Sequence, residues 1–464
     1  MDELLASSLR EIAEAIRSKR VSAKQVTVAF LDRINRVNPA LNAVIASNAE
    51  AALKQAGRAD IALSGGETPG KLFGVPMTIK DSLDTFDMTT TWGTVGRKDF
   101  RPGRDATCVA RLRHEGAILL GKTNTPEFTL SFKTDNLLFG KTNNPYDLSR
   151  TPGGSSGGAA AAIAAGCTPF DIGTDTGGSI RLPSHFCGIA GIKPTSGRVP
   201  CTGNALPNSG LLAPLSQPGP MAKRVDDLIY LLETIQGPDF EDPNTVPAPW
   251  HNPYDVDVTR LRVGFHLDNG ISEPDTEIQK TIAATIELLL SAGIRCYESR
   301  PTGLEMAGFI YSRLFAADDG EMVDLLLEDC RTQSPSPPVA EIVHRPPGKL
   351  SASEFAQLIH LWHNYQSSML NFFVEHDISI CPVNAKTAIA HEQAEDFSDY
   401  TYTAAYNLTG WPSVVIRAGT DSKGLPIGVQ ILARPFADHD ALALAAWLEE
   451  RLESFDGPDL DTCS

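Results

Sequence analysis

The sequence lacks the paired ligand spacing of a metal site. Its eight cysteines are scattered over 464 residues and form no C-x-x-C pair. Structural zinc takes ligands paired at short spacing, and disulfide frameworks belong to short secreted chains. We therefore expect buried free thiols, no metal and no other cofactor.

Positive charge and long apolar runs are also scarce. The 40 Lys and Arg residues face 57 Asp and Glu residues, which gives a formal net charge of −17, and no basic run reaches five residues. Such a chain repels polyphosphates, so we expect no nucleic-acid partner. The apolar run "AAAAIAAG" is far shorter than the ~20 residues that span a bilayer, and the acidic start "MDELLASSLREIAEAI" lacks the positive region of a signal peptide. We expect a cytoplasmic monomer or homodimer with no membrane partner.

What the sequence does contain is an alternation of helical and strand patterns. Apolar residues recur at helical spacing between positions 5 and 16, and "SAKQ" (22–25) offers a capping box for a second helix, which we expect to end near Asn38-Pro39. "FGVPMTIKD" (73–81) is typical of a strand ending at Lys80, and residues 105–124 predict a helix and then a buried strand. This alternation predicts an α/β fold with a sheet covered by helices.

Strand and helix patterns lie on both sides of a central stretch bounded by two proline-rich segments, 237–254 and 333–348. Because the pattern continues after this stretch, we expect a single large domain over residues 1–464. The stretch at about 237–350 is predicted to be a mainly helical insertion into that domain.

Residues 151–181, "TPGGSSGGAAAAIAAGCTPFDIGTDTGGSIR", hold two glycine-flanked serine clusters. A flexible linker is disfavoured because the first cluster runs directly into an Ala/Ile helix. A phosphate cradle at a helix start is a second hypothesis, but neither a P-loop Lys-Ser/Thr pair nor the G-x-G-x-x-G spacing is present. The third hypothesis is an acyl-transfer site, which needs an activated nucleophile and backbone N–H donors for the oxyanion.

"DTGGSIR" (175–181) supplies both requirements of the third hypothesis. Gly177 and Gly178 can adopt backbone angles closed to other residues, so their N–H groups can converge beside the hydroxyl of Ser179. His185 is one candidate base, although we expect it to pack against the sheet. A neutral lysine is the alternative, and Lys80 at a strand end is the candidate.

These residues carry a resemblance to the amidase signature family of serine hydrolases. The blocks that match its pattern are 74–81 ("GVPMTIKD"), 119–128 ("LLGKTNTPEF"), 151–195 and 407–419 ("NLTGWPSVVIRAG"). The resemblance implies a mixed central β-sheet with helices on both faces. It implies that Lys80 is the catalytic base, Ser155 a bridging serine at a cis peptide bond, and Ser179 the nucleophile. It also implies an oxyanion hole from the backbone of Thr176, Gly177, Gly178 and Ser179, and supporting roles for Ser156, Asp175 and Arg181.

The expected reaction is amide hydrolysis through a Ser179 acyl-enzyme. Phe128, Thr129, Leu130, Ser131 and Phe132 are candidates for an acyl pocket, although Phe128 and Phe132 also fit an ordinary core. The expected substrate is a small primary amide of an apolar or aryl acid, indole-3-acetamide among them. Two alternatives stay open: the glutaminase (A-type) subunit of a tRNA-dependent amidotransferase, which would work with partner subunits, and a non-catalytic scaffold.

Overall fold

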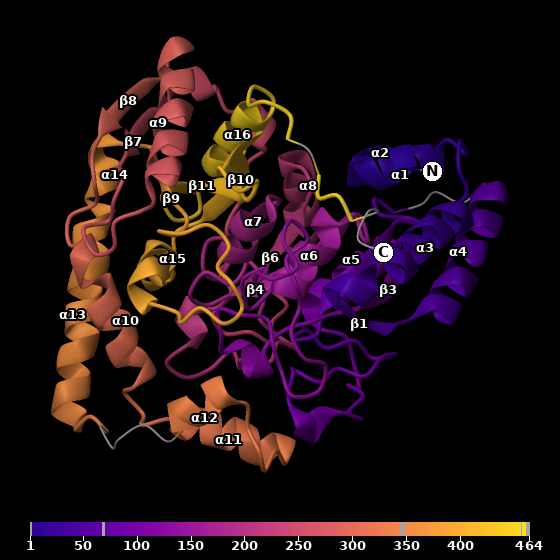
Figure 1. Ribbon diagram of the computed structural model, residues 1–464, viewed down its shortest axis with the longest axis horizontal. Helices are drawn as coiled ribbons and strands as arrows, with labels where there is room; N and C mark the ends of the chain where they lie inside the picture. Colours follow the sequence, from indigo (N-terminus) through magenta and orange to yellow (C-terminus); the bar gives the residue numbers. More distant parts are fainter. Residues whose placement is uncertain (1, 67–69, 344–348, 456, 461–464) are drawn as a thin grey trace.

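The computed structural model describes residues 2–66, 70–343, 349–455 and 457–460 as a mixed α/β fold (Figure 1). The strands are β1 (Val44–Ser47), β2 (Pro76–Lys80), β3 (Ile118–Thr123), β4 (Phe170–Asp175), β5 (Ala190–Lys193), β6 (Gln217–Ala222), β7 (Arg262–Phe265), β8 (Arg295–Glu298), β9 (Ile378–Pro382), β10 (Ser413–Thr420) and β11 (Pro426–Ala433). The helices are α1 (Asp2–Ala6), α2 (Leu9–Arg17), α3 (Ala23–Leu41), α4 (Ala49–Ser64), α5 (Thr107–His114), α6 (Gly157–Ala164), α7 (Arg181–Cys187), α8 (Val225–Ile235), α9 (Thr276–Ser291), α10 (Ala307–Phe315), α11 (Glu321–Cys330), α12 (Pro337–Val343), α13 (Ala352–Leu370), α14 (Phe372–Glu375), α15 (Phe397–Thr409) and α16 (Asp438–Glu449).

The strands form two sheets. A three-stranded sheet has the order β1-β3-β2, and an eight-stranded sheet has the order β4-β6-β5-β10-β11-β9-β7-β8. The large sheet is mixed, because β7 pairs in parallel with β8 and β9 while the remaining pairs are antiparallel. All eight residues of β11 are buried, as expected for a strand covered on both faces. The mixed sheet predicted from the sequence is confirmed.

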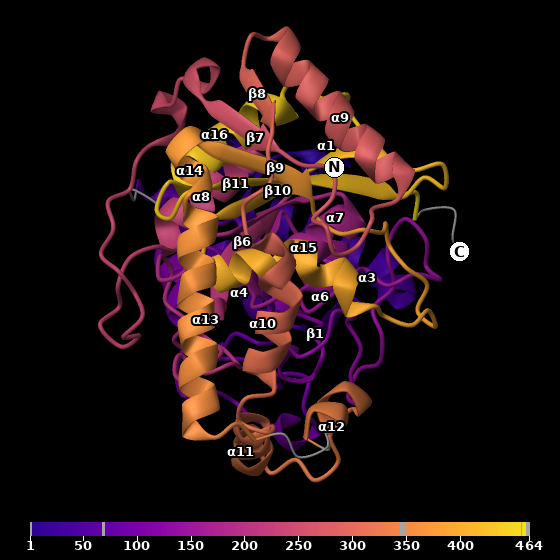
Figure 2. The ribbon, with the colours of Figure 1, turned by 90° about the vertical axis from the view of Figure 1, so that its left-hand side faces the viewer.

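Helices cover both faces of the large sheet. In Figure 2, α9 and α16 lie on one side of β9, β10 and β11, and α7 and α15 lie on the other. Val414 and Ile416 of β10 belong to the main apolar core together with Leu442 and Leu444 of α16. Successive strand residues face opposite sides, so Val415 points to the other face, where it lies beside Gly428 and near α7. The core is therefore split into layers by the sheet.

The structure corrects two details of the N-terminal helices. The first helical pattern is divided into α1 and α2, because Ser8 caps a new helix with a capping box to Glu11. The helix capped by Ser22 and Gln25 runs through Pro39 instead of ending near it. Pro39 removes one N–H near the helix end, where one lost hydrogen bond is tolerated, and the chain leaves the helix at Asn42, whose φ is 52°.

The central stretch 237–350 contributes more than helices. It includes α9 to α12, but β7 and β8 also lie within it and extend the large sheet beyond β9. The part of the second proline-rich segment at 344–348 lies outside the described residues.

The cysteines within the described chain are free thiols, and all are buried except Cys296, which is half-buried. No group of His, Cys, Asp and Glu residues in the described ranges could hold a metal ion. Among the helices described, none is long and apolar enough to cross a membrane.

Candidate active site

Lys80 ends β2, and its side chain is completely buried. Its Nζ atom lies 2.7 Å from Ser155 Oγ, 2.9 Å from Ser156 Oγ and 2.8 Å from Thr174 Oγ1. Burial lowers the pKa of Lys80 well below its usual value, although Asp175 and Asp171 act in the opposite direction. The geometry and the pKa direction both favour an amine that loses its proton easily.

The three contacts of Lys80 fit a neutral amine, which has two N–H bonds and one lone pair. Ser156 Oγ lies 3.3 Å from the carbonyl oxygen of Thr174, so its own proton has an acceptor and its oxygen can accept from Lys80. Thr174 can accept the second N–H. The lone pair is then left for the hydroxyl proton of Ser155.

Ser155 and Ser156 stand in the glycine-rich loop before α6, and the Gly154–Ser155 peptide bond is cis. The expectation left open which bond is cis, and the structure places it before Ser155. A Cβ atom at Gly158 would lie 2.4 Å from the backbone nitrogen of Asn124, so only glycine lets this helix approach β3 so closely. The glycines therefore bring the two serines to the end of β2.

Asp171 on β4 supports the strand that carries Lys80. Its carboxylate accepts hydrogen bonds from the backbone N–H of Lys80 at 2.8 Å, from Thr78 Oγ1 at 2.6 Å and from Thr123 Oγ1 at 3.0 Å. Burial raises the pKa of Asp171 to about 6, although these hydrogen bonds oppose the rise. The sequence analysis missed this residue, because the hydrogen bonds join segments more than forty residues apart.

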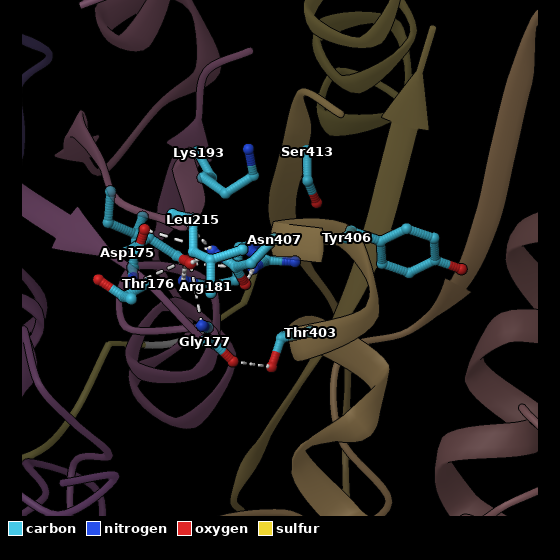
Figure 3. A network of polar contacts seen from close by, with 12 residues as sticks. Asp175, Thr176, Gly177, Arg181, Lys193, Leu215, Thr403, Tyr406, Asn407 and Ser413 are labelled. Atoms are coloured by element: carbon cyan, nitrogen blue, oxygen red, sulfur yellow. Dashed lines mark hydrogen bonds and ion pairs between the residues drawn. The ribbon is translucent and has the colours of Figure 1, made fainter. Parts of the chain in front are cut away.

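Ser179 lies in the tight turn between β4 and α7. Asp175 and Arg181 form a fully buried ion pair across this turn, with 2.9 Å between Asp175 Oδ1 and Arg181 NH2. Asn407 of α15 donates to Asp175 Oδ1 at 2.9 Å and accepts from Arg181 at 2.5 Å, as Figure 3 shows. Burial alone would raise the pKa of Asp175, but Arg181 and Asn407 hold it well below its usual range. The ion pair fixes the turn that presents Ser179.

The backbone donors of this turn are divided between two tasks. The N–H of Gly178 donates to Asp175 Oδ1 at 2.9 Å. Within the described chain, the N–H groups of Thr176, Gly177 and Ser179 make no hydrogen bond. The expected set of oxyanion donors therefore loses Gly178, whose N–H is already taken, and keeps the other three.

A pocket of about 300 Å³ opens beside Ser179. Its lining residues are Thr129, Leu130, Ser131, Phe132, Thr176, Gly177, Ser179, Tyr311, Ser312, Phe315, Ile342 and Phe397. Thr129, Leu130, Ser131 and Phe132 thus take the predicted place. In the described part of the chain, no charged side chain lines this pocket.

Phe128 does not line the pocket and is a core residue. It is fully buried in an apolar cluster with Leu206, Leu327 and Val339. Its backbone has φ of 50°, a left-handed conformation that is rare for a bulky residue. That turn directs Phe128 into the core and leaves the next four residues on the pocket wall.

The far wall of the pocket was not predicted. Tyr311 stacks on Phe315 and Phe397, and Phe132 stacks on Tyr400 with 4.0 Å between ring centroids. Tyr311 and Phe315 are one helical turn apart on α10, a spacing equally typical of ordinary core. No sequence signal separated these aromatic residues from core residues.

His185 is buried away from the reacting groups, as expected. Its Nδ1 atom accepts from the backbone N–H of Gly428 at 2.7 Å, so the proton is on Nε2, which lies 3.0 Å from the Lys386 carbonyl oxygen. Burial lowers the pKa of His185 to about 4. Both ring nitrogens are occupied by backbone groups, which leaves no free nitrogen to act as a base for Ser179.

Comparisons with known proteins agree with this geometry. A family model described as Amidase matches residues 25–442. The chain is 34% identical to the A-type subunit of the glutamyl-tRNA(Gln) amidotransferase of Bdellovibrio bacteriovorus, over 96% of this chain and 97% of that protein. It is 33% identical to a second such A-type protein, number 2 of Clostridium acetobutylicum, over 97% of this chain and 99% of that protein.

Solved structures show the same fold. A substrate complex of 6-aminohexanoate cyclic dimer hydrolase superposes with a TM-score of 0.87 at 27% identity, covering 98% of this chain and 99% of the other. A bacterial aryl acylamidase of the amidase signature family superposes with a TM-score of 0.86 at 26% identity, covering 96% of each chain. The chain therefore belongs to the Amidase family and is an amide-cleaving enzyme.

Proposed function

We propose that Ser179 attacks a carboxylic amide and forms an acyl-enzyme, with Lys80 as the base and Ser155 as the proton relay. The observation that carries this proposal is the 2.7 Å contact between Lys80 Nζ and Ser155 Oγ in a fully buried cluster. The N–H of Ser156 donates to the carbonyl oxygen of Ser179 at 3.1 Å, so the serine loop and the nucleophile turn are directly joined.

In the proposed acylation, neutral Lys80 accepts the proton of Ser155 while Ser155 accepts that of Ser179. The Ser179 oxygen then bonds to the amide carbon, and the carbonyl oxygen becomes an oxyanion beside the free backbone N–H groups. The carbon–nitrogen bond breaks as the relay returns a proton to the leaving nitrogen. Water repeats the same steps in deacylation and releases the carboxylate.

The pocket supports an apolar or aryl acyl group. Phe132, Tyr311, Phe315 and Phe397 offer ring faces, and the described lining offers no charged side chain. Glutamine would bring an ammonium and a carboxylate, which are costly to bury without charged partners. We propose that the chain by itself favours an apolar primary amide, although no relative supports indole-3-acetamide in particular.

A second function is favoured by the curated relatives. Their names describe the A-type component of a glutamyl-tRNA(Gln) amidotransferase, and this supports the glutaminase alternative better than a free-standing amidase. In that role, the chain would release ammonia from glutamine and work with partner subunits and tRNA. The apolar pocket is the specific observation that weighs against this second function for the isolated chain.

One assay separates the two functions. The purified chain is given acetamide, phenylacetamide and glutamine, with and without amidotransferase partner subunits and tRNA, and ammonia release is measured. We expect phenylacetamide to be the best substrate of the chain alone. Glutamine as the best substrate, or activity only with the partners, would establish the amidotransferase function instead.

The same assay tests the nucleophile. Ser179→Ala removes one hydroxyl and is expected to abolish ammonia release while the fold stays intact. Ser184→Ala is the matched control, since Ser184 is a buried serine of α7 whose hydroxyl bonds the Ile180 carbonyl oxygen at 2.8 Å. A folded Ser179→Ala variant with a tenth or more of wild-type turnover would refute the proposed mechanism.

A further inference from the structure

The peptide unit between Gly177 and Gly178 is held at both ends. Its N–H donates to Asp175 Oδ1 at 2.9 Å. Its carbonyl oxygen accepts from the hydroxyl of Thr403 at 2.7 Å, a contact visible in Figure 3. A peptide unit fixed at both ends cannot rotate, so the peptide units on either side of it are also restricted.

The two neighbouring peptide units accept hydrogen bonds at their carbonyl oxygens. The Thr176 carbonyl lies 3.3 Å from the hydroxyl of Tyr311, and the Gly178 carbonyl accepts from the N–H of Leu182 at 2.7 Å. The N–H groups of these same two units belong to Gly177 and Ser179, which face the pocket. A hydrogen bond at the carbonyl polarises the peptide unit and strengthens its N–H as a donor.

Thr403 and Tyr311 also pack tightly against the turn. A Cβ atom added at Gly178 would collide with the Thr403 side chain, and one added at Gly177 would collide with the Tyr311 hydroxyl. Thr403 is fully buried, and Tyr311 is 6% exposed. Helices α10 and α15 therefore enclose the turn, and each contributes one hydroxyl to it.

We propose that Thr403 and Tyr311 are positioning residues for the oxyanion hole. Their hydroxyls hold the turn so that the N–H groups of Gly177 and Ser179 point at the oxygen that becomes negative in the transition state. This inference rests on the proposed function of Ser179. It adds two residues, outside the glycine-rich segment, on which the rate depends without contact between them and the reacting atoms.

A purely structural role makes a different prediction. The Thr403 hydroxyl also lies 3.0 Å from the Tyr400 carbonyl oxygen in its own helix, as helical threonines commonly do. If that contact were its role, Thr403→Val would change stability alone. If the contact to Gly177 is what matters, the variant loses transition-state stabilisation while ground-state binding stays the same.

The test compares Thr403→Val with Thr401→Val. Thr401 is a fully buried threonine on the same helix, but its hydroxyl bonds the Ser398 carbonyl oxygen at 2.6 Å and accepts from Asn269. Acylation of Ser179 is followed with phenylacetamide and with the activated ester p-nitrophenyl phenylacetate. The binding of phenylacetaldehyde, which forms a tetrahedral adduct with a serine, is measured alongside the KM for phenylacetamide.

We expect Thr403→Val to lower kcat and weaken aldehyde binding roughly 10- to 100-fold with little change in KM. Thr401→Val should leave all three quantities near the wild type, and Thr403→Ser should restore the rate. Tyr311→Phe should give a smaller loss of the same kind, because its contact is longer, and it tests the inference if Thr403→Val does not fold.

Equal kcat and equal aldehyde affinity in Thr403→Val and Thr401→Val would overturn the inference. So would a loss confined to KM or to thermal stability. Failure of the proposed function looks different: wild-type protein would not hydrolyse phenylacetamide, or Ser179→Ala would remain active, whatever Thr403 does.

Discussion

Lys80 Nζ and Ser155 Oγ lie 2.7 Å apart although the two residues are 75 positions apart in the sequence. Lys80 comes from the end of β2, and Ser155 comes from the loop before α6. The first has no solvent contact and a lowered pKa, and the second has its hydroxyl beside the amine lone pair. This contact lets a lysine do the work of the histidine in a more familiar triad.

Replacement of the base should abolish acylation without unfolding the protein. Lys80→Met keeps the length and apolar character that a buried site accepts, but it removes the proton acceptor. We expect kcat to fall by about two to four orders of magnitude, the range typical of lost general-base catalysis. The measurement is single-turnover acylation by phenylacetamide.

Lys193→Met is the matched control for that variant. Lys193 is also a fully buried lysine at the end of a strand, β5, and its Nζ atom donates to the Pro194 carbonyl oxygen at 2.9 Å. The control shows what the loss of a buried amine does to folding. An acylation rate in Lys80→Met no lower than in Lys193→Met would remove Lys80 from the mechanism.

The pH dependence should report the lowered pKa of Lys80. Only the neutral amine accepts a proton, so the acylation rate rises as pH increases through the pKa of Lys80 and is constant above it. Because burial lowers this pKa well below 10.5, the plateau should begin well below pH 10.5. A pH–rate profile of kcat/KM measures the midpoint, and a rate still rising in proportion to hydroxide near pH 10.5 would contradict the assignment.

The order of elements was accessible from the sequence because local patterns encode it. The apolar run ending at Lys80 became β2, and Gly166, with φ of 72°, follows α6 as predicted. The reacting residues were accessible because Lys80, Ser155 and Ser179 match a known family. The long-range pairings of Asp171 and of Asn407 were not accessible, because nothing in one segment specifies the distant side chain that it meets.

The pocket shows the same limit. Phe128 and Phe132 have equivalent places in the helical spacing, yet one is core and the other lines the pocket. The difference arises from consecutive positive φ angles at Phe128 and Thr129, which a spacing argument cannot foresee. Tyr311 and Phe315 likewise line the pocket only because α10 of the central stretch packs against α15.

His185 should prove structural. Its ring nitrogens bond the backbone of Gly428 and Lys386, so His185→Ala is expected to destabilise the fold by roughly 2–4 kcal/mol, as for other large buried side chains. The folded variant should keep kcat within about threefold of the wild type, a change of less than 1 kcal/mol in activation free energy. Thermal unfolding and steady-state kinetics on one preparation measure both effects.

The acid sensitivity of stability gives a second readout for His185. Its pKa is about 4 in the folded protein, below the ordinary 6.5, so the unfolded chain binds the proton more readily. This group therefore lowers stability as pH falls from 6.5 towards 4. Between those limits, stability should fall less steeply in His185→Ala than in the wild type. An unchanged slope together with a large loss of kcat would point to a catalytic role.

Phe132 and Phe128 form a matched pair for the acyl pocket. Phe132 lines the pocket beside Ser179, so Phe132→Ala should weaken the preference for phenylacetamide over acetamide by about 1–3 kcal/mol in kcat/KM, the value of one lost apolar side chain. Phe128→Ala should instead cost about 3–5 kcal/mol of folding stability and leave the preference unchanged, because Phe128 lies in the core. The ratio of kcat/KM for the two amides and the free energy of unfolding are measured for both variants. A preference unchanged in Phe132→Ala, or lost equally in both, would place the acyl group elsewhere than against this wall.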